Sequence, residues 1–122
     1  MTHILANNKA INARQLAVKI CMAVLTQGQS LSQQLDKQLK NLQAKRDQAL
    51  CSELCYGFCR YYFVLSAQLK ALLNKPLKLK DQDIQVILLL GLYQIRFMRT
   101  DDHAAVNETV NLVNLRKKKW AK

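Results

Sequence analysis

The apolar residues of this chain recur at helical spacing in several separate segments. In residues 12–28 they lie three and four positions apart, as on one face of an amphipathic helix; they are Ala13, Leu16, Ala17, Ile20, Cys21, Val24 and Leu25. Asn12 is a typical N-cap before this segment, and Gly28 is typical of the residue just past a helix end. The pattern predicts a helix between Asn12 and Gly28.

A narrower apolar stripe follows in residues 30–42. Ser30 and Gln33 have the spacing of a capping box at a helix start. The apolar positions behind them are Leu31, Leu35, Leu39 and Leu42. Because this apolar face is narrow, we expect the second helix to lie on the surface.

From about Asp47 to Leu73 the apolar pattern is long enough for two helices or one bent helix, with a break expected near Ser66. Pro76 disfavours helix at the residue before it, so "NKPLKLKD" is predicted to be a loop. Asp81 or Asp83 then caps the next helix.

Residues 84–97 are apolar on nearly all sides of a helix, since only Gln85, Gln94 and Arg96 are clearly polar. A spanning helix needs about 20 apolar residues, and this segment is shorter. We therefore expect it to be the central helix of a globular bundle, with Gly91 at a close approach of another element.

A last helix is predicted after the turn formed by "TDDH". Its expected inner face contains Ala105, Val106, Thr109, Val110 and Val113. The helix ends in the basic sequence "RKKKW", and cations at a helix C-terminus interact favourably with its dipole.

Composition agrees with an all-α fold. The 122 residues include three glycines and one proline, too few turn residues for the many hairpins of an all-β protein. We expect about six helices around the central apolar helix, in one domain over residues 12–122 that follows an N-terminal extension, residues 1–11. The N-terminus has no secretory pattern, and free cysteines suit a reducing compartment, so a cytoplasmic location is expected.

Three cysteines and two histidines are the candidates for metal binding: Cys51, Cys55, Cys59, His3 and His103. The cysteines recur every four residues, which places the outer two about 12 Å apart on a helix, too far to share one metal. Two of them with a histidine remain an alternative to the expected role of buried apolar residues, which Cys21 shares.

The sequence also shows no evident set of residues for acid–base catalysis. His103 follows two aspartates at a helix start, where local hydrogen bonding is expected, and Glu108 has no evident acid or base partner. We assign no catalytic residue and no metal site.

Several motifs, in this order, resemble one known family. "ARQLAVKICMAVLTQGQSL", "ELCYGFCR", "KPL", "GLYQI" and "HAAVNETV" look like the NusB-like N-terminal domain of the bacterial small-subunit ribosomal RNA cytosine-5 methyltransferases, the RsmB (Sun/Fmu) family. The resemblance covers residues 12–122, and NusB itself shares the helical plan with less similar segments. It implies a NusB-like helical bundle.

The chain departs from the family pattern in two places. Thr100, Asp101 and Asp102 stand in the turn where the family usually has a proline. Family members also continue with a Gly-Leu-Val-Asn-Ala-Val-Leu-Arg-like final helix and a Rossmann-like catalytic domain, which this sequence does not reach. The resemblance therefore implies a truncated domain with exposed apolar surface on the central or last helix, and self-association as the consequence.

Methyl transfer is not expected of this chain alone. The family binds S-adenosylmethionine at a strand and Gly-rich turn, and it uses a cysteine nucleophile in a Pro-Cys or Thr-Cys loop. Neither feature is present here. The resemblance thus implies no enzyme activity and no cofactor in this chain, with S-adenosylmethionine expected for the full-length enzyme.

The charge points to a polyanionic partner. Nineteen Lys and Arg against eight Asp and Glu give a net charge of +11. The candidate RNA contacts are Lys9, Arg14, Lys45, Arg46, Arg116, Lys117, Lys118 and Lys119. Lys45 and Arg46 are expected in a loop, where solvation is an alternative role, and Trp120 either stacks on a base or packs on the core.

The expected function is an RNA-binding module that helps position small-subunit ribosomal RNA for methylation by a downstream domain. Its partners would be ribosomal RNA and that domain, with no membrane. The alternative is a protein-interaction scaffold, as NusB pairs with a small ribosomal protein in transcription antitermination. A third, weaker hypothesis is a standalone regulatory fragment.

Overall fold

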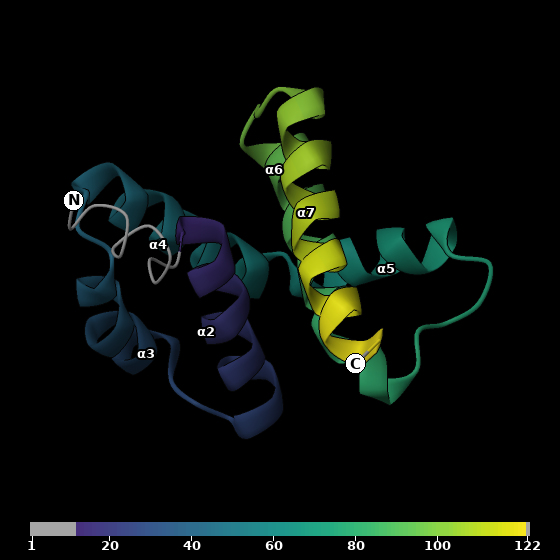
Figure 1. Ribbon diagram of the computed structural model, residues 1–122, viewed down its shortest axis with the longest axis horizontal. Helices are drawn as coiled ribbons and strands as arrows, with labels where there is room; N and C mark the ends of the chain where they lie inside the picture. The colour runs from purple at the N-terminus through teal and green to yellow at the C-terminus, as the bar shows by residue number, and fades with distance from the viewer. Residues whose placement is uncertain (1–11, 122) are drawn as a thin grey trace. The chain divides into compact units, whose positions relative to one another are not determined.

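The computed structural model describes the backbone of residues 12–121 and the side chains of residues 12–116. This part of the chain is all-α and contains no strand (Figure 1). Its elements are α2 (Ala13–Gln27), α3 (Leu31–Gln38), the 3₁₀ helix η1 (Leu39–Asn41), α4 (Lys45–Arg60), α5 (Tyr62–Leu72), the 3₁₀ helix η2 (Leu79–Asp81), α6 (Gln82–Phe97) and α7 (Asp102–Ala121). The predicted fold class and the expected six helices are confirmed.

The chain forms two compact units, which divide between Cys55 and Tyr56 within α4. In the first unit, α2 packs against α3. The face of α2 that carries Leu16, Ala17 and Ile20 is fully buried. Leu35 is the buried residue of α3, which confirms that this helix lies on the surface.

Helix α2 begins and ends at the predicted caps, a side-chain cap at Asn12 and a backbone cap at Gly28. The Asn12 side chain accepts a hydrogen bond from the Gln15 N–H at 2.7 Å, and the Gln15 side chain accepts one from the Asn12 N–H at 3.0 Å. At the other end, Gly28 has a φ of 66°, a conformation that glycine adopts without steric cost. The complete capping box is thus at Asn12, whereas at α3 Ser30 supplies a single bond, to the Gln33 N–H at 3.4 Å.

We expect Asn12→Ala to lower the free energy of unfolding by about 1 kcal/mol, because it leaves an N–H at the helix start without its acceptor. Urea unfolding followed by circular dichroism measures the change. Asn12→Ser retains a capping oxygen and should cost a few tenths of a kcal/mol at most. An equal loss in both variants would show that the cap does not stabilise this helix.

The break between α4 and α5 lies at Tyr61, five residues before the predicted position at Ser66. Serine interrupts helices when its hydroxyl competes for backbone hydrogen bonds. Here the Ser66 Oγ is buried and makes no hydrogen bond among the described residues, so α5 continues through it. Tyr61 instead leaves helical geometry, with φ −108° and ψ 17°, and its ring stacks on Phe97 of α6.

The second unit is organised around α6, which contacts both α5 and α7. Eight of its residues are buried: Ile84, Val86, Ile87, Leu89, Leu90, Gly91, Tyr93 and Gln94. The predicted close approach at Gly91 is confirmed, because a Cβ there would clash with the Thr109 side chain of α7. Thr109 is fixed by its hydroxyl, which donates to the Ala105 carbonyl at 2.7 Å.

Three aromatic rings pack together within the second unit, where they connect the junction of α4 and α5 to α6. Tyr61 and Phe97 stack with centroids 4.2 Å apart, and Tyr93 lies 6.1 Å from Tyr61 and 5.6 Å from Phe97. The Tyr93 ring rests against the backbone of Gly57, where a Cβ would overlap it. The absence of a side chain at Gly57 therefore permits this cluster.

Candidate nucleic-acid interface

The predicted basic residues of the first unit lie at two helix starts. Arg14 is half-buried in the first turn of α2, and Lys45 and Arg46 are exposed. The latter two were expected in a loop, but they begin α4, because the backbone N–H groups of Asp47 and Gln48 bond to the Ala44 carbonyl at 3.1 Å. Two cations at the positive end of a helix dipole favour an anion nearby.

The basic end of α7 belongs to the second unit. The Arg116 guanidinium lies 3.8 Å from the Asp83 carboxylate, so this predicted RNA contact is paired with an acid. Asp83 also accepts a hydrogen bond from the Ile84 N–H at 2.9 Å, whereas Asp81 makes no side-chain cap. Helix α7 continues through residues 117–121, but the side chains of Lys117, Lys118, Lys119 and Trp120, like Lys9, lie outside the described residues.

A further basic segment, not selected from the sequence, connects α5 to α6. It contains Lys75, Lys78 and Lys80, and Lys70 lies just before it in the last turn of α5; all four lysines are exposed. The lysines alternate with leucines in "PLKLKD", which is the signal that could have identified them. In the sequence alone these lysines predict no more than a solvated loop, because isolated lysines are usually exposed to solvent.

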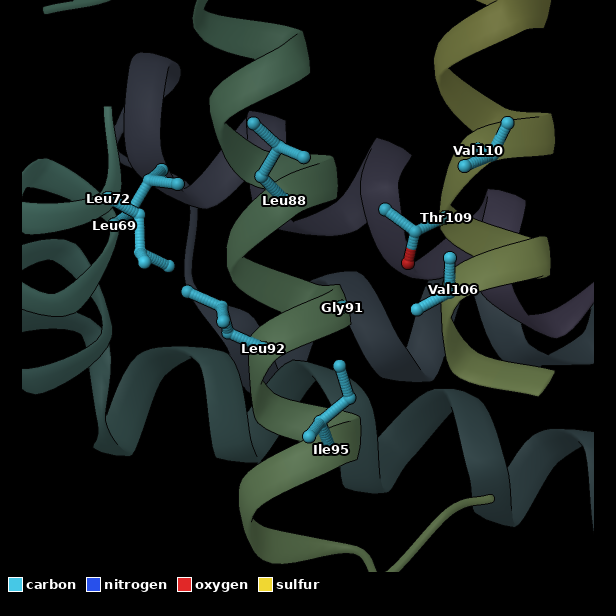
Figure 2. A pocket seen from close by; sticks show the side chains of 9 residues that line it. All are labelled: Leu69, Leu72, Leu88, Gly91, Leu92, Ile95, Val106, Thr109 and Val110. Atoms are coloured by element: carbon cyan, nitrogen blue, oxygen red, sulfur yellow. The ribbon is translucent and has the colours of Figure 1, made fainter. Parts of the chain in front are cut away.

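One flank of α6 is not covered by the second unit. An apolar groove of about 270 Å³ lies between α5, α6 and α7. Figure 2 shows the side chains that line it. Its lining residues are Leu69, Leu72, Leu88, Gly91, Leu92, Ile95, Val106, Thr109 and Val110. Except for the Thr109 hydroxyl, these side chains offer no polar group, so the groove suits an apolar helix face rather than a phosphate.

The groove corrects two predictions. The central helix is not buried on all sides, since Leu88 and Leu92 are half-buried and Ile95 is exposed. The predicted inner face of α7 is also partly wrong: Ala105 is buried, but Val106 and Val110 are 49% and 48% exposed at the groove. Apolar surface on the central and last helices is thus exposed, as the resemblance implies.

Three of the four cysteines are buried, and the surroundings of Cys51 disfavour its thiolate. Cys21, Cys51 and Cys55 are buried as expected, and the Cys55 Sγ donates a 3.9 Å hydrogen bond to the Ala17 carbonyl. A hydrogen bond with Cys55, together with burial, raises the pKa of the Cys51 thiol far above its usual range. A protonated thiol is a weak nucleophile and a poor metal ligand.

Cys59 was expected to be buried but is exposed. Eight residues turn a helix by two full turns and about 80° more, so Cys59 leaves the face on which Cys51 lies. Desolvation by its neighbours still raises the pKa of the Cys59 thiol.

The described residues contain neither a metal-binding cluster nor a membrane-spanning helix. No group of three or more His, Cys, Asp or Glu side chains in residues 12–116 is placed to hold a metal ion. Within the helices assigned above, none is long and apolar enough to cross a membrane. His103 lies exposed in the first turn of α7, after Asp101, whose carboxylate accepts a hydrogen bond from the Ala104 N–H at 3.3 Å.

Comparison with known proteins identifies relatives of one kind. The chain is 41% identical over 112 residues to ribosomal RNA small subunit methyltransferase B of Pseudomonas syringae pv. tomato, covering 92% of the chain and 25% of that protein. It is 42% identical over 99 residues to the protein of the same name from Shewanella oneidensis, covering 81% and 23%. A probable ribosomal RNA small subunit methyltransferase B of Coxiella burnetii is 44% identical over 78 residues, covering 64% and 18%.

The chain therefore spans about a quarter of the length of these relatives. The model of the NusB family matches residues 11–122, nearly the whole sequence. This chain belongs to the NusB family.

Proposed function

We propose that this chain is an RNA-binding module that helps position small-subunit ribosomal RNA for cytosine-5 methylation by a downstream domain. The observation that carries the proposal is a net charge of +11 on a NusB-family chain whose relatives are named ribosomal RNA methyltransferases. A domain so basic attracts a polyanion, and its relatives' names indicate which one. Cytoplasmic location and a physical link to the methyltransferase domain are parts of this proposal.

The chain's own contribution is electrostatic docking. Lysine and arginine side chains neutralise phosphates and release counterions, which supplies affinity without reading sequence. Exposed cations at the start of α4 and on the α5–α6 connection are available for such contacts. S-adenosylmethionine would be bound, and the methyl group transferred, by the downstream domain, while this chain orients the RNA.

RNA binding can be tested by fluorescence anisotropy with a labelled small-subunit ribosomal RNA hairpin at several salt concentrations. Wild-type protein should bind with an affinity that falls steeply with salt, by a factor of about 10 or more between 50 and 200 mM if at least two phosphates are contacted. Changing Lys117, Lys118 and Lys119 together to glutamate should weaken binding at low salt by more than tenfold and reduce the salt slope.

A matched control changes three exposed lysines of the first unit, Lys19, Lys37 and Lys40, to glutamate. It alters the net charge equally, so a smaller loss in this control would localise the contact to the end of α7. Absence of binding by the wild type at low salt would contradict the proposed function for this chain.

The groove favours a second candidate function, that of a protein-interaction scaffold. Its apolar lining fits the apolar face of a helix, in the helix-in-groove mode of recognition. In the isolated chain a second copy can supply that face through Val106 and Val110 of its own α7. If RNA binds only when a protein partner is added, the scaffold function is favoured over the RNA module.

A further inference from the structure

The connection between α5 and α6 is basic and open to contact. The connection contains Lys75, Lys78 and Lys80. Together with Lys70, in the last turn of α5, they occur within eleven residues that contain no acid. Leu79, between the last two, is 84% exposed, so this part of the connection is not packed down on its own unit. The lysines therefore have surface around them on which a ligand can lie.

The end of α7 lies beside this connection. Arg116, in α7, pairs with Asp83, which is only two residues beyond η2 and 13% exposed. Figure 1 shows the last turns of α7, in yellow, next to the start of α6 within the second unit. Two basic segments that are about 35 residues apart in the sequence thus meet at one end of this unit.

The charge at this end is strongly one-sided. Residues 70–83 and 116–119 together contain eight basic and two acidic residues. One of the two acids, Asp83, already has Arg116 as its partner. The ion pair therefore neutralises one of the two acids, and the net charge of these two stretches of sequence remains strongly positive.

We propose that Lys75, Lys78 and Lys80, which lie beside the end of α7, form a face that binds the phosphate backbone of RNA. The inference rests on the proposed function and adds the α5–α6 connection to its contacts. Lysine is a flexible point charge suited to phosphates rather than to base edges, so this face supplies affinity and orientation without sequence preference.

The test compares two variants of equal net charge in the anisotropy assay. The connection variant is Lys75→Gln/Lys78→Gln/Lys80→Gln, and the control is Lys19→Gln/Lys37→Gln/Lys40→Gln, all at exposed positions. The connection variant should lose more than tenfold in affinity at low salt. Its slope of log affinity against log salt should also become shallower by about 2, because each lost phosphate contact reduces the slope by about 0.7 to 0.9. The control should lose less than threefold.

Each alternative result has a distinct meaning. Equal losses in the two variants would show that only net charge matters, and would overturn the proposed face while leaving RNA binding intact. Wild-type protein that fails to bind the hairpin at any salt would overturn the proposed function itself. If poly-glutamate displaces the RNA as effectively as unlabelled hairpin at equal charge, the face recognises an acidic protein and the RNA assignment is wrong.

Discussion

Gly57→Ala is expected to lower the free energy of unfolding by about 2 kcal/mol, although alanine is the better helix former. The new Cβ would overlap the Tyr93 ring. That ring cannot move away freely, because it is held in the stack with Tyr61 and Phe97. Overpacking of this kind costs about 1 to 3 kcal/mol, and each aromatic pair that is disturbed adds about 0.5 to 1.5 kcal/mol.

A double-mutant cycle identifies the cause of this loss. In a Tyr93→Leu background the flexible side chain can yield, so Gly57→Ala should cost little or even stabilise the helix, by up to about 1 kcal/mol. Urea unfolding of the four proteins gives the coupling energy. An equal cost of Gly57→Ala with tyrosine or leucine at position 93 would show that the aromatic contact is not the reason for the glycine.

The wild-type chain is expected to self-associate through the apolar groove. The double substitution Val106→Glu/Val110→Glu is expected to abolish this self-association. Both valines are about half exposed, so glutamate at these positions removes apolar groove surface without emptying the core. Two charges facing an apolar partner would be desolvated without a counter-ion, which strongly disfavours the contact. Sedimentation velocity should show a concentration-dependent oligomer for the wild type and a monomer for the variant.

Asn107→Glu/Asn111→Glu is the matched control, since both asparagines are exposed on α7 and do not line the groove. It changes the charge by the same amount and should leave the oligomer intact. Salt gives a further distinction, because screening the net charge of +11 should strengthen self-association while it weakens RNA binding. A wild-type protein that stays monomeric at high concentration and high salt would contradict this role of the groove.

The local features of the fold were accessible from the sequence because each depends on neighbours in the chain. The limits of α2 follow from Asn12 and Gly28, whose capping and backbone preferences act within one turn. The close approach at Gly91 was also predicted, since a glycine inside an apolar helix is otherwise unfavourable. The nature of the contact, a threonine side chain of α7, was not.

The misplaced features depend on contacts between distant residues. The break at Tyr61 reflects the position of its ring against Phe97, thirty-six residues away. The exposure of Val106 and Val110 reflects which flank of α6 the described part of the second unit leaves uncovered. Periodicity identifies an apolar face but cannot say whether another element covers it.

The sequence by itself determined the all-α class, the principal helices and the strong positive charge, because these follow from composition and short-range spacing. Only the tertiary structure decided where apolar surface stays open and which basic segments meet. Arg116 and Asp83 illustrate the reason. The sequence shows that both residues are charged, but only the packing of α6 against α7 brings the two charges together. Packing is a property of side chains brought together across the fold, which no local pattern records.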